Sequence, residues 1–199
     1  MGLFRNRGLT DDERARIPPG QHLVRNFPVL DVQGPPYNEV PPDWDMRIWG
    51  DVANPQRWSF DELLALPAVR EVIDIHCVTS WSKLDTLWSG VPMSFVLEAV
   101  GPDPAATHVI AHAEAGYTTN VSLAALRAPG VLLAYEYDGL PLDPEHGYPL
   151  RLVVPQLYFW KSAKWLRGLE FRSSDQPGFW ERRGYSNSAD PWKEERYSF

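Results

Sequence analysis

Short runs in which apolar and polar side chains alternate recur along the chain from residue 46 onward. Successive side chains of a β-strand point to opposite faces, so a period of two residues predicts a strand with one buried face. In the segment EVIDIHCV, Ile73, Ile75 and Cys77 share one face. Asp74 and His76 share the other. By the same criterion, strands are predicted at residues 46–52, 71–78, 107–113, 117–121, 131–142, 150–154 and 166–171.

Signals for short helices and turns separate these strands. Ser59 and Glu62 have the spacing of a capping box, which predicts a helix start. Pro92 predicts the start of a second helix, and Ser122 is placed to cap a third. The Asp-Gly pair at 138–139 predicts a tight hairpin. Many short strands with a few short helices, not in βαβ alternation, predict an α+β fold with mixed β-sheets.

The first 42 residues have a different pattern. They contain the segments PPG, GPP and VPP and few periodic apolar positions, which is typical of chain without regular structure. We therefore expect residues 1–42 to form an extended arm that packs on a single domain of residues 43–199. Val24 and residues 27–30 are its predicted anchors. A chain of 199 residues is long enough for one domain with one sizeable core.

Composition excludes several classes of function. No apolar run approaches the roughly 18 residues that a spanning helix needs, so no membrane span is expected. The charges near the N-terminus are not followed by an apolar stretch, which is not typical of a secretory signal, and we expect a cytoplasmic protein. A net charge of −7 argues against nucleic acid as a partner. The sequence has neither of the glycine-rich motifs of dinucleotide and nucleotide triphosphate sites.

Cys77 is the only cysteine, so no internal disulfide can form. Most single cysteines are small buried residues of a core. Cys77, however, ends an apolar strand and opens the polar loop VTSWS. A strand end presents a side chain on a rigid support, and a thiolate is a good ligand for a heavy transition metal.

A second candidate region combines a histidine, an arginine and a cluster of short donors. The segment HGYPLRLVVP places His146 before a strand and Arg151 on it. Ser162 and Lys164 follow closely, and a hydroxyl, a backbone N–H and an ammonium at this spacing suit a phosphate. Residues 151–172 contain five basic side chains and a single acidic one, Glu170. This excess of positive charge indicates a local anion site or, alternatively, a solvated surface.

In combination these segments resemble the sulfite oxidase family of molybdopterin-dependent oxidoreductases, over nearly the whole chain from about residue 20. The HG-x-P-x-R-x-VVP strand at 146–155 and the S-x-KW turn at 162–165 are similar to the family's pterin-binding region. Cys77 lies where the family has its single ligand cysteine. VRNFPV at 24–29 resembles the family's arm across the metal site, and WSGV at 88–91 resembles the segment that lines its substrate pocket.

The resemblance implies a sulfite oxidase-type molybdopterin-binding fold and a cofactor of molybdenum held by the dithiolene of one molybdopterin. Cys77 would be the protein ligand to the metal. The cofactor phosphate would meet Arg151, Ser162, the backbone of Ala163 and Lys164. His146 would bond the pterin or the phosphate, and His112 is either a further pterin contact or a core histidine. The metal would be closed off by Arg25, Asn26 and Phe27, and its pocket would be walled by Trp88.

The implied chemistry is oxygen-atom transfer on a small substrate, either a sulfite-like anion or a sulfoxide or N-oxide. Electrons would be exchanged with a separate partner, a haem protein or a small carrier. Two departures bear on the substrate. The loop after Cys77 has no arginine, where full sulfite oxidases place one, and Phe27 stands in place of a histidine. The missing arginine favours a less charged substrate than sulfite.

Two other readings of the sequence stay open. The chain could be a catalytically degenerate module that binds pterin or an anion without turnover. It could also be a zinc hydrolase, although no HExxH or CxxC motif supports this. The zinc ligands would come from His22, His76, Cys77, His108, His112 and His146.

Overall fold

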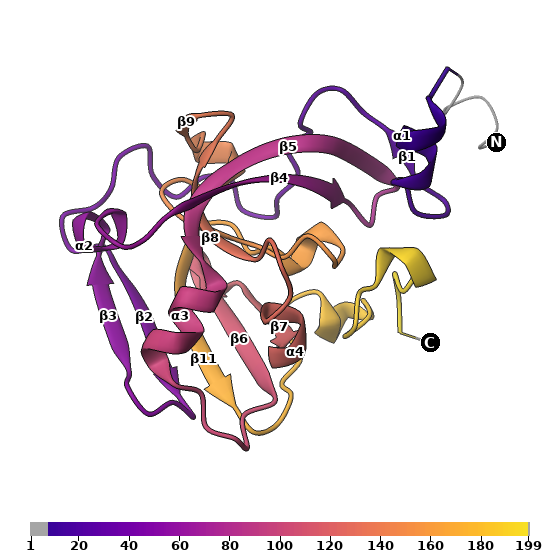
Figure 1. The fold of residues 1–199 in the computed structure, drawn as a ribbon. Helices are drawn as coiled ribbons and strands as arrows, with labels where there is room; N and C mark the ends of the chain where they lie inside the picture. Colours follow the sequence, from indigo (N-terminus) through magenta and orange to yellow (C-terminus); the bar gives the residue numbers. More distant parts are fainter. Residues whose placement is uncertain (1–7, 199) are drawn as a thin grey trace.

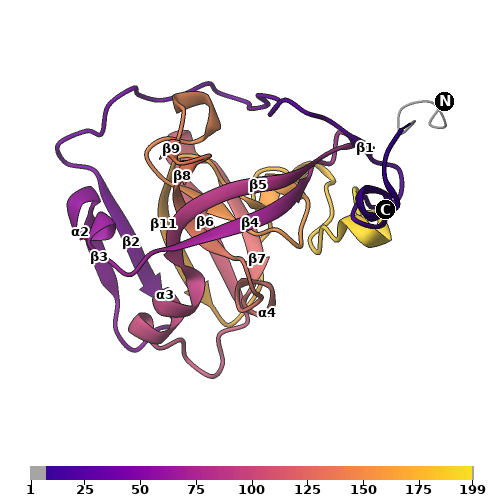
Figure 2. The same cartoon turned by 45° about the horizontal axis from the view of Figure 1, so that its top comes forward.

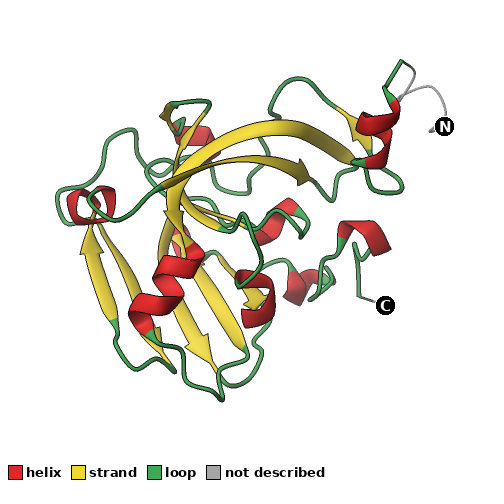
Figure 3. Cartoon of the chain, viewed as in Figure 1, coloured by secondary structure: helices red, strands yellow, loops and turns green. Residues whose placement is uncertain are grey.

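The computed structural model describes residues 8–198, so the first seven residues of the predicted arm and Phe199 lie outside it. Two mixed β-sheets with a few short helices make up the fold (Figures 1 and 3). This confirms the predicted α+β class. The first sheet contains β1 (His22–Leu23), β4 (Val69–His76), β5 (Trp81–Pro92), β8 (Leu132–Tyr137), β9 (Leu140–Pro141) and β10 (Arg151–Val153). The second contains β2 (Asp45–Gly50), β3 (Gln56–Ser59), β6 (His108–Ala113), β7 (Thr118–Ser122) and β11 (Leu166–Arg172).

In the first sheet, β4 and β5 form a long curved hairpin that extends toward the N-terminal end of the chain (Figure 1). The sequence predicted β4 but not β5. Most side chains of β5 are buried on both faces, so the period of two that reveals a half-buried strand is lost. Gly90 lies where β5 meets β8, and a Cβ there would stand 2.2 Å from the Leu133 carbonyl oxygen. Only glycine fits this close approach of two backbones.

The second sheet has the strand order β3-β2-β11-β6-β7, with β11 parallel to β2 and antiparallel to β6. The predicted pairing of the strands around 107–113 and 117–121 is confirmed. Alternation of side chains did not predict β3, which has only four residues and one buried side chain. A strand this short has too few positions to show a period.

The helices begin where their capping signals predict. In α2 (Phe60–Leu64), Ser59 and Glu62 form the reciprocal capping box. α3 (Met93–Val100) follows Pro92 and ends at Gly101, which adopts a left-handed conformation. The Ser122 hydroxyl accepts a hydrogen bond from the Ala125 N–H at the start of α4 (Leu123–Leu126).

The main core lies between the two sheets. It joins Met46 of β2 and Leu169 of β11 to Leu133 of β8 and Leu152 of β10. Burial of such apolar surface contributes about 25 cal/mol per Å², so this contact holds the two sheets together. A smaller apolar cluster surrounds Cys77, and it is the one that borders the candidate site.

The arm is not extended throughout. α1 (Asp11–Ala15) starts at a capping box formed by Thr10 and Glu13, and β1 pairs parallel with β5. From there the arm crosses the molecule without a helix or strand to β2 (Figure 2). None of the helices within residues 8–198 is long and apolar enough to cross a membrane.

Of the five predicted anchors of the arm, Val24, Phe27 and the half-buried Pro28 lie against the body, and two do not. Val24 and Phe27 pack against the apolar cluster around Cys77. Val29 and Leu30 are 42% and 51% exposed, so their prediction as anchors was wrong. The arm has no regular structure at this point, and the sequence pattern therefore carries no period that would tell an inward side chain from an outward one.

Candidate functional site

Cys77 is the first residue after β4 and begins the turn that connects β4 to β5. The Cys77 N–H donates to the Trp81 carbonyl at 2.8 Å, and the Ser80 N–H donates back to the Cys77 carbonyl at 3.0 Å. Ser80 closes the turn with a positive φ of 73°. The thiol is therefore held by a rigid hairpin end and is largely buried, as the strand-end position predicted.

A cavity of about 300 Å³ lies against this thiol. That volume is at the lower end of the range for small-molecule sites, about 300–1,000 Å³. Separate parts of the chain line it: residues of the arm between 27 and 33, the turn at 77–79, the segment 159–165 except Lys161, and Trp180 and Tyr185 near the C-terminus. Trp81, Tyr117, His146 and Arg151 complete the lining. Seven of the residues proposed from the sequence therefore meet in one cavity: Phe27, Cys77, His146, Arg151, Ser162, Ala163 and Lys164.

Arg151 is a buried cation that pairs with no acidic side chain of residues 8–198. Its Nη1 donates to the His146 carbonyl at 2.6 Å, and its Nη2 donates to the Ser162 carbonyl at 2.9 Å. Its Nε has no hydrogen-bond partner. Burial lowers the pKa of Arg151 to about 9, so the guanidinium is still charged at neutral pH. A buried charge is costly unless an opposite charge pairs with it, so an anion bound in this cavity would offset that cost.

Lys164 is the second cation of the cavity. Its Nζ donates to the Glu145 carbonyl at 2.8 Å and lies 3.3 Å from the Asp31 carboxylate of the arm. Burial, followed by the charge of Arg151, lowers the pKa of Lys164 to about 8. Gly147 explains how Lys164 and Arg151 come so close. A Cβ at Gly147 would stand 3.2 Å from the Lys164 Cα and 3.1 Å from the Arg151 Cβ.

His146 and Ser162 fix the walls around these cations. The His146 ring stacks on Phe27 with 4.0 Å between ring centroids, and burial lowers the pKa of His146. Its buried Nε2 has no hydrogen-bond partner. The Ser162 hydroxyl accepts from the Val154 N–H at 2.9 Å, which fixes the position of the Ser162 side chain. The neutral His146 ring therefore offers a free nitrogen beside two positive charges.

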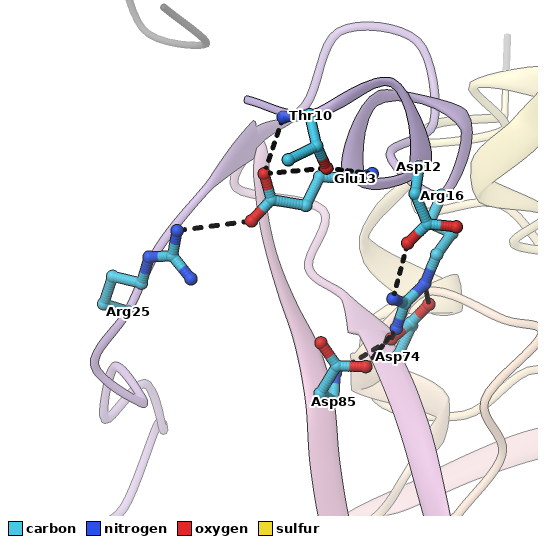
Figure 4. Close-up of polar contacts among 7 residues, drawn as sticks. All are labelled: Thr10, Asp12, Glu13, Arg16, Arg25, Asp74 and Asp85. Atoms are coloured by element: carbon cyan, nitrogen blue, oxygen red, sulfur yellow. Dashed lines mark hydrogen bonds and ion pairs between the residues drawn. The ribbon is translucent and has the colours of Figure 1, made fainter. Parts of the chain in front are cut away.

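Arg25 and Asn26 do not reach the cavity. The Arg25 side chain is 83% exposed and pairs with Glu13 of α1 at 3.2 Å (Figure 4), and Asn26 is exposed. α1 is itself fixed by Arg16, whose guanidinium contacts Asp74 of β4 and a second carboxylate of β5 (Figure 4). The sequence pattern did not show α1, so the ion pair that draws Arg25 away from the metal side was not foreseen.

His112 and Trp88 also lie outside the cavity lining. His112 of β6 lies 3.0 Å from the Glu170 carboxylate of β11, so of its two predicted roles the structure shows that of a packed histidine. Trp88 is fully buried and donates to the Thr86 hydroxyl at 2.8 Å. Its ring lies behind Phe27, 6.0 Å between centroids, so Trp88 supports a wall of the cavity rather than forming it.

The structure adds residues that the sequence did not indicate. The Thr79 hydroxyl donates to the Cys77 sulfur at 3.2 Å. Asp31 of the arm lies against Lys164, and Arg196 near the C-terminus donates to the Val78 carbonyl beside the thiol. Each of the last two acts on a residue more than a hundred positions away, so no local pattern could have revealed them.

The electrostatic surroundings of Cys77 are mixed. Burial raises the pKa of the Cys77 thiol, while the Thr79 hydroxyl and the charge of Arg196 act in the opposite direction. Cysteine binds a metal as the thiolate. A metal cation bound at Cys77 would therefore favour the thiolate over the thiol.

Cys77 has no set of protein ligands around it. Within residues 8–198, no group of three or more His, Cys, Asp and Glu side chains is placed to hold a metal ion. The zinc alternative therefore has no ligand set in the described part of the chain. A metal bound at Cys77 must bring most of its own ligands, which is what a dithiolene-bearing cofactor does.

Comparison with known proteins points to the same chemistry. The family model described as the oxidoreductase molybdopterin binding domain matches residues 33–180. The uncharacterized oxidoreductase YuiH of Bacillus subtilis is 47% identical over 188 residues, which cover 94% of this chain and 95% of that protein. The protein-methionine-sulfoxide reductase catalytic subunit MsrP of Gluconobacter oxydans is 31% identical over 160 residues, 71% of this chain and 51% of the relative.

Two further comparisons cover about half of the matched protein. The sulfite oxidase of Arabidopsis thaliana is 27% identical over 177 residues, 71% of this chain and 45% of that protein. The crystal structure of the sulfane dehydrogenase SoxCD from Paracoccus pantotrophus superposes with a TM-score of 0.63 at 20% identity, over 92% of this chain and 57% of that chain. At this identity the structural likeness shows a shared fold.

Proposed function

The chain belongs to the family of oxidoreductase molybdopterin-binding domains, and on that premise we propose that it is a molybdenum-cofactor enzyme with Cys77 as the thiolate ligand. Its relation to sulfite oxidase and to the MsrP reductase subunit is confirmed. The chain spans nearly all of the Bacillus relative but only about half of these two. Their activities therefore enter here as proposals.

One observation carries the assignment: a single thiol and an unpaired buried guanidinium line the same cavity. When bound, the cofactor would supply oxygen-atom transfer at its metal, and the protein would bind and orient the reactants. Arg151 and Lys164 offer the positive charge that the cofactor phosphate requires, and Ser162 and the Ala163 backbone lie beside them.

The remaining residues of the cavity have supporting roles in this proposal. The free His146 Nε2 is a hydrogen-bond partner for a polar atom of the pterin. Phe27 covers this ring by stacking and thereby keeps water from it. Arg25 would reach the metal side only if its ion pair with Glu13 opened, so we assign it no contact with the cofactor.

For the substrate we propose a sulfoxide or N-oxide in preference to sulfite. The cavity near Cys77 is walled by aromatic side chains, namely Trp81, Phe159, Trp160, Trp180 and Tyr185. No basic residue follows Cys77 before Lys83, whose ammonium is bonded to the Arg25 carbonyl. Because Arg151 and Lys164 would be paired with the cofactor phosphate, the wall left for the substrate is mainly aromatic, which suits a neutral substrate better than an anion. Electrons would then come from a separate redox partner.

The proposal is tested by metal and pterin analysis of protein made in a cofactor-competent host. We expect molybdenum and pterin in equal amounts, and turnover of sulfoxides or N-oxides with an artificial electron donor. Sulfite with an artificial acceptor is the comparison substrate, and efficient sulfite oxidation would contradict the substrate assignment. Protein that lacks molybdenum, or that holds pterin without turnover, would support the alternative of a degenerate binding module.

A further inference from the structure

The turn that presents Cys77 is held from both ends of the chain. On one side, the buried Gln21 side chain donates from its Nε2 to the Cys77 carbonyl at 3.0 Å. The next residue of the arm, His22, donates its N–H to the Ser80 carbonyl at 3.0 Å. The arm thus occupies the first and last carbonyls of the turn.

From the C-terminal side, Arg196 binds one of the two carbonyls between them, that of Val78. Its Nη1 donates to the Val78 carbonyl at 2.5 Å, across a sequence separation of 118 residues. Its side chain is only 15% exposed, and its guanidinium lies 5.0 Å from the centroid of the Tyr158 ring. Among the residues that the structure describes, the carboxylate that pairs with it is that of Glu194, at a long distance of 3.8 Å.

The backbone around Arg196 is fixed as well. The Ser186 N–H donates to the Arg196 carbonyl at 3.2 Å, and Tyr185 and Tyr197 form an antiparallel bridge. Tyr185 also lines the cavity. The tail from Tyr185 to Tyr197 is therefore docked beside the cysteine turn, and Arg196 is the side chain that links the two.

We infer that Arg196 is a positioning residue for the Cys77 thiolate: it fixes the turn through the Val78 carbonyl and supplies a positive charge that the turn itself lacks. The inference rests on the proposed function, because the role of a thiolate follows from Cys77 being the metal ligand. Residues 78–82 contain no basic side chain. Arg196 does not line the cavity, so it acts through Val78 and not on the substrate.

The physical consequence of losing Arg196 follows from the turn geometry. Val78 and Thr79 both line the cavity, and Thr79 donates to the Cys77 sulfur. Without Arg196, the Val78 carbonyl would lose a charge-assisted hydrogen bond that is partly buried. The peptide could then rotate, which would displace Thr79 from the sulfur and alter the orientation of the thiolate.

The first test measures amide hydrogen exchange of the turn in cofactor-free protein, so it does not depend on metal. In Arg196→Met we expect the Cys77 and Ser80 amides to exchange about tenfold faster, because local opening is no longer opposed by this bond. Arg196→Gln keeps a donor and should stay near the wild-type rate. Arg182→Met is the matched control, since Arg182 is an exposed tail arginine that donates to the Pro177 carbonyl.

The second test uses the loaded enzyme and separates charge from hydrogen bonding. The absorption that arises from thiolate-to-molybdenum charge transfer should shift in Arg196→Met and Arg196→Gln, and Arg196→Lys should restore it. Unchanged exchange and an unchanged band in Arg196→Met, as in Arg182→Met, would overturn the inference. Protein without molybdenum would instead count against the proposed function, while the exchange result would still decide the role of Arg196 in the turn.

Discussion

Two buried cations ten residues apart in the sequence have opposite surroundings. The Lys161 ammonium lies 2.7 Å from the Glu181 carboxylate and donates to the backbone and side-chain oxygens of Asn120 at 2.8 Å. Arg151 is as deeply buried, yet its guanidinium donates only to two backbone carbonyls and lies over the Phe159 ring, 4.3 Å from its centroid. The sequence places both in one basic segment. The structure separates a cation that is complete within the fold from one that a ligand would complete.

The comparison explains why charge alone does not identify a site. Lys161 is paired with Glu181, a buried acid that lies twenty positions further along the chain. The Glu181 carboxylate also accepts from Thr119 and Trp160. Arg151 has no such acid, and it lines the cavity with Cys77. A buried cation therefore indicates a binding site only where the fold leaves its charge unpaired.

The largest expected effect is on the paired cation. Lys161→Met should lower the free energy of unfolding by about 3–5 kcal/mol, because it leaves the Glu181 charge buried without a partner. Chemical denaturation of the cofactor-free protein measures this. Lys193→Met removes an exposed pair with Asp190 and should change the free energy of unfolding very little. Equal losses of unfolding free energy in Lys161→Met and Lys193→Met would contradict the special role of the buried pair.

Arg151→Met should affect cofactor binding more than stability. Its unfolding free energy should fall by only about 1–2 kcal/mol, because the lost carbonyl bonds are partly offset by removal of an unpaired buried charge. Molybdenum and pterin content should fall at least about tenfold, since a bond to a charged group contributes about 1.5–3 kcal/mol and about 1.4 kcal/mol is a factor of ten. Unchanged cofactor content would contradict the phosphate-binding role.

Lys164 sharpens the comparison through pH. Its pKa is lowered from 10.5 to about 8, so in cofactor-free protein the ammonium loses its proton as the pH rises through about 8. Affinity for inorganic phosphate, measured by calorimetry, should therefore weaken above that pH. The fold itself should gain stability from about pH 8 toward 10.5, because only the unfolded chain still binds that proton there.

Two variants control the pH experiment. Lys164→Arg keeps its charge through this range, so its phosphate affinity should lose the step near pH 8. Lys164→Met should bind phosphate weakly at every pH. A wild-type step that persists in Lys164→Met would assign the titration to another group.

The smallest expected effect concerns Asp31. Its carboxylate competes with an anionic ligand for Lys164, and the pair is near the surface. Asp31→Asn should raise phosphate affinity about twofold to threefold, in line with the roughly 0.5 kcal/mol of such a pair. Asp43→Asn, a substitution of an exposed acidic residue directly after the arm, is the control. A loss of affinity in Asp31→Asn would show that Asp31 supports the site instead of competing for it.

Patterns of neighbouring residues were sufficient to predict the strands that have one buried face and the helices that have a capping residue. Alternation revealed β4, β6 and β11, and capping residues revealed α2 and α3, because each has one buried face or a marked end. β5 was missed because both of its faces are buried. α1 was missed although Thr10 and Glu13 have the capping-box spacing, because the proline-rich surroundings suggested only extended chain.

The candidate site divides in the same way. The cysteine and the phosphate segment were predicted from their spacing and from family resemblance, and seven of those residues meet in the cavity. Arg25, Asn26 and His112 were assigned by resemblance and lie elsewhere, because α1 and β11 provide acids that hold Arg25 and His112. Asp31 and Arg196 were not foreseen, since only the folded chain brings them to the site.

The central claim is that Cys77 is the protein ligand of a molybdenum held by molybdopterin. X-ray absorption at the molybdenum edge of loaded wild-type protein and of Cys77→Ser tests it most directly. We expect the molybdenum to have one sulfur neighbour fewer in Cys77→Ser, with loss of turnover and a fold that remains intact by circular dichroism. An unchanged number of sulfur neighbours, or an active Cys77→Ser enzyme, would contradict it.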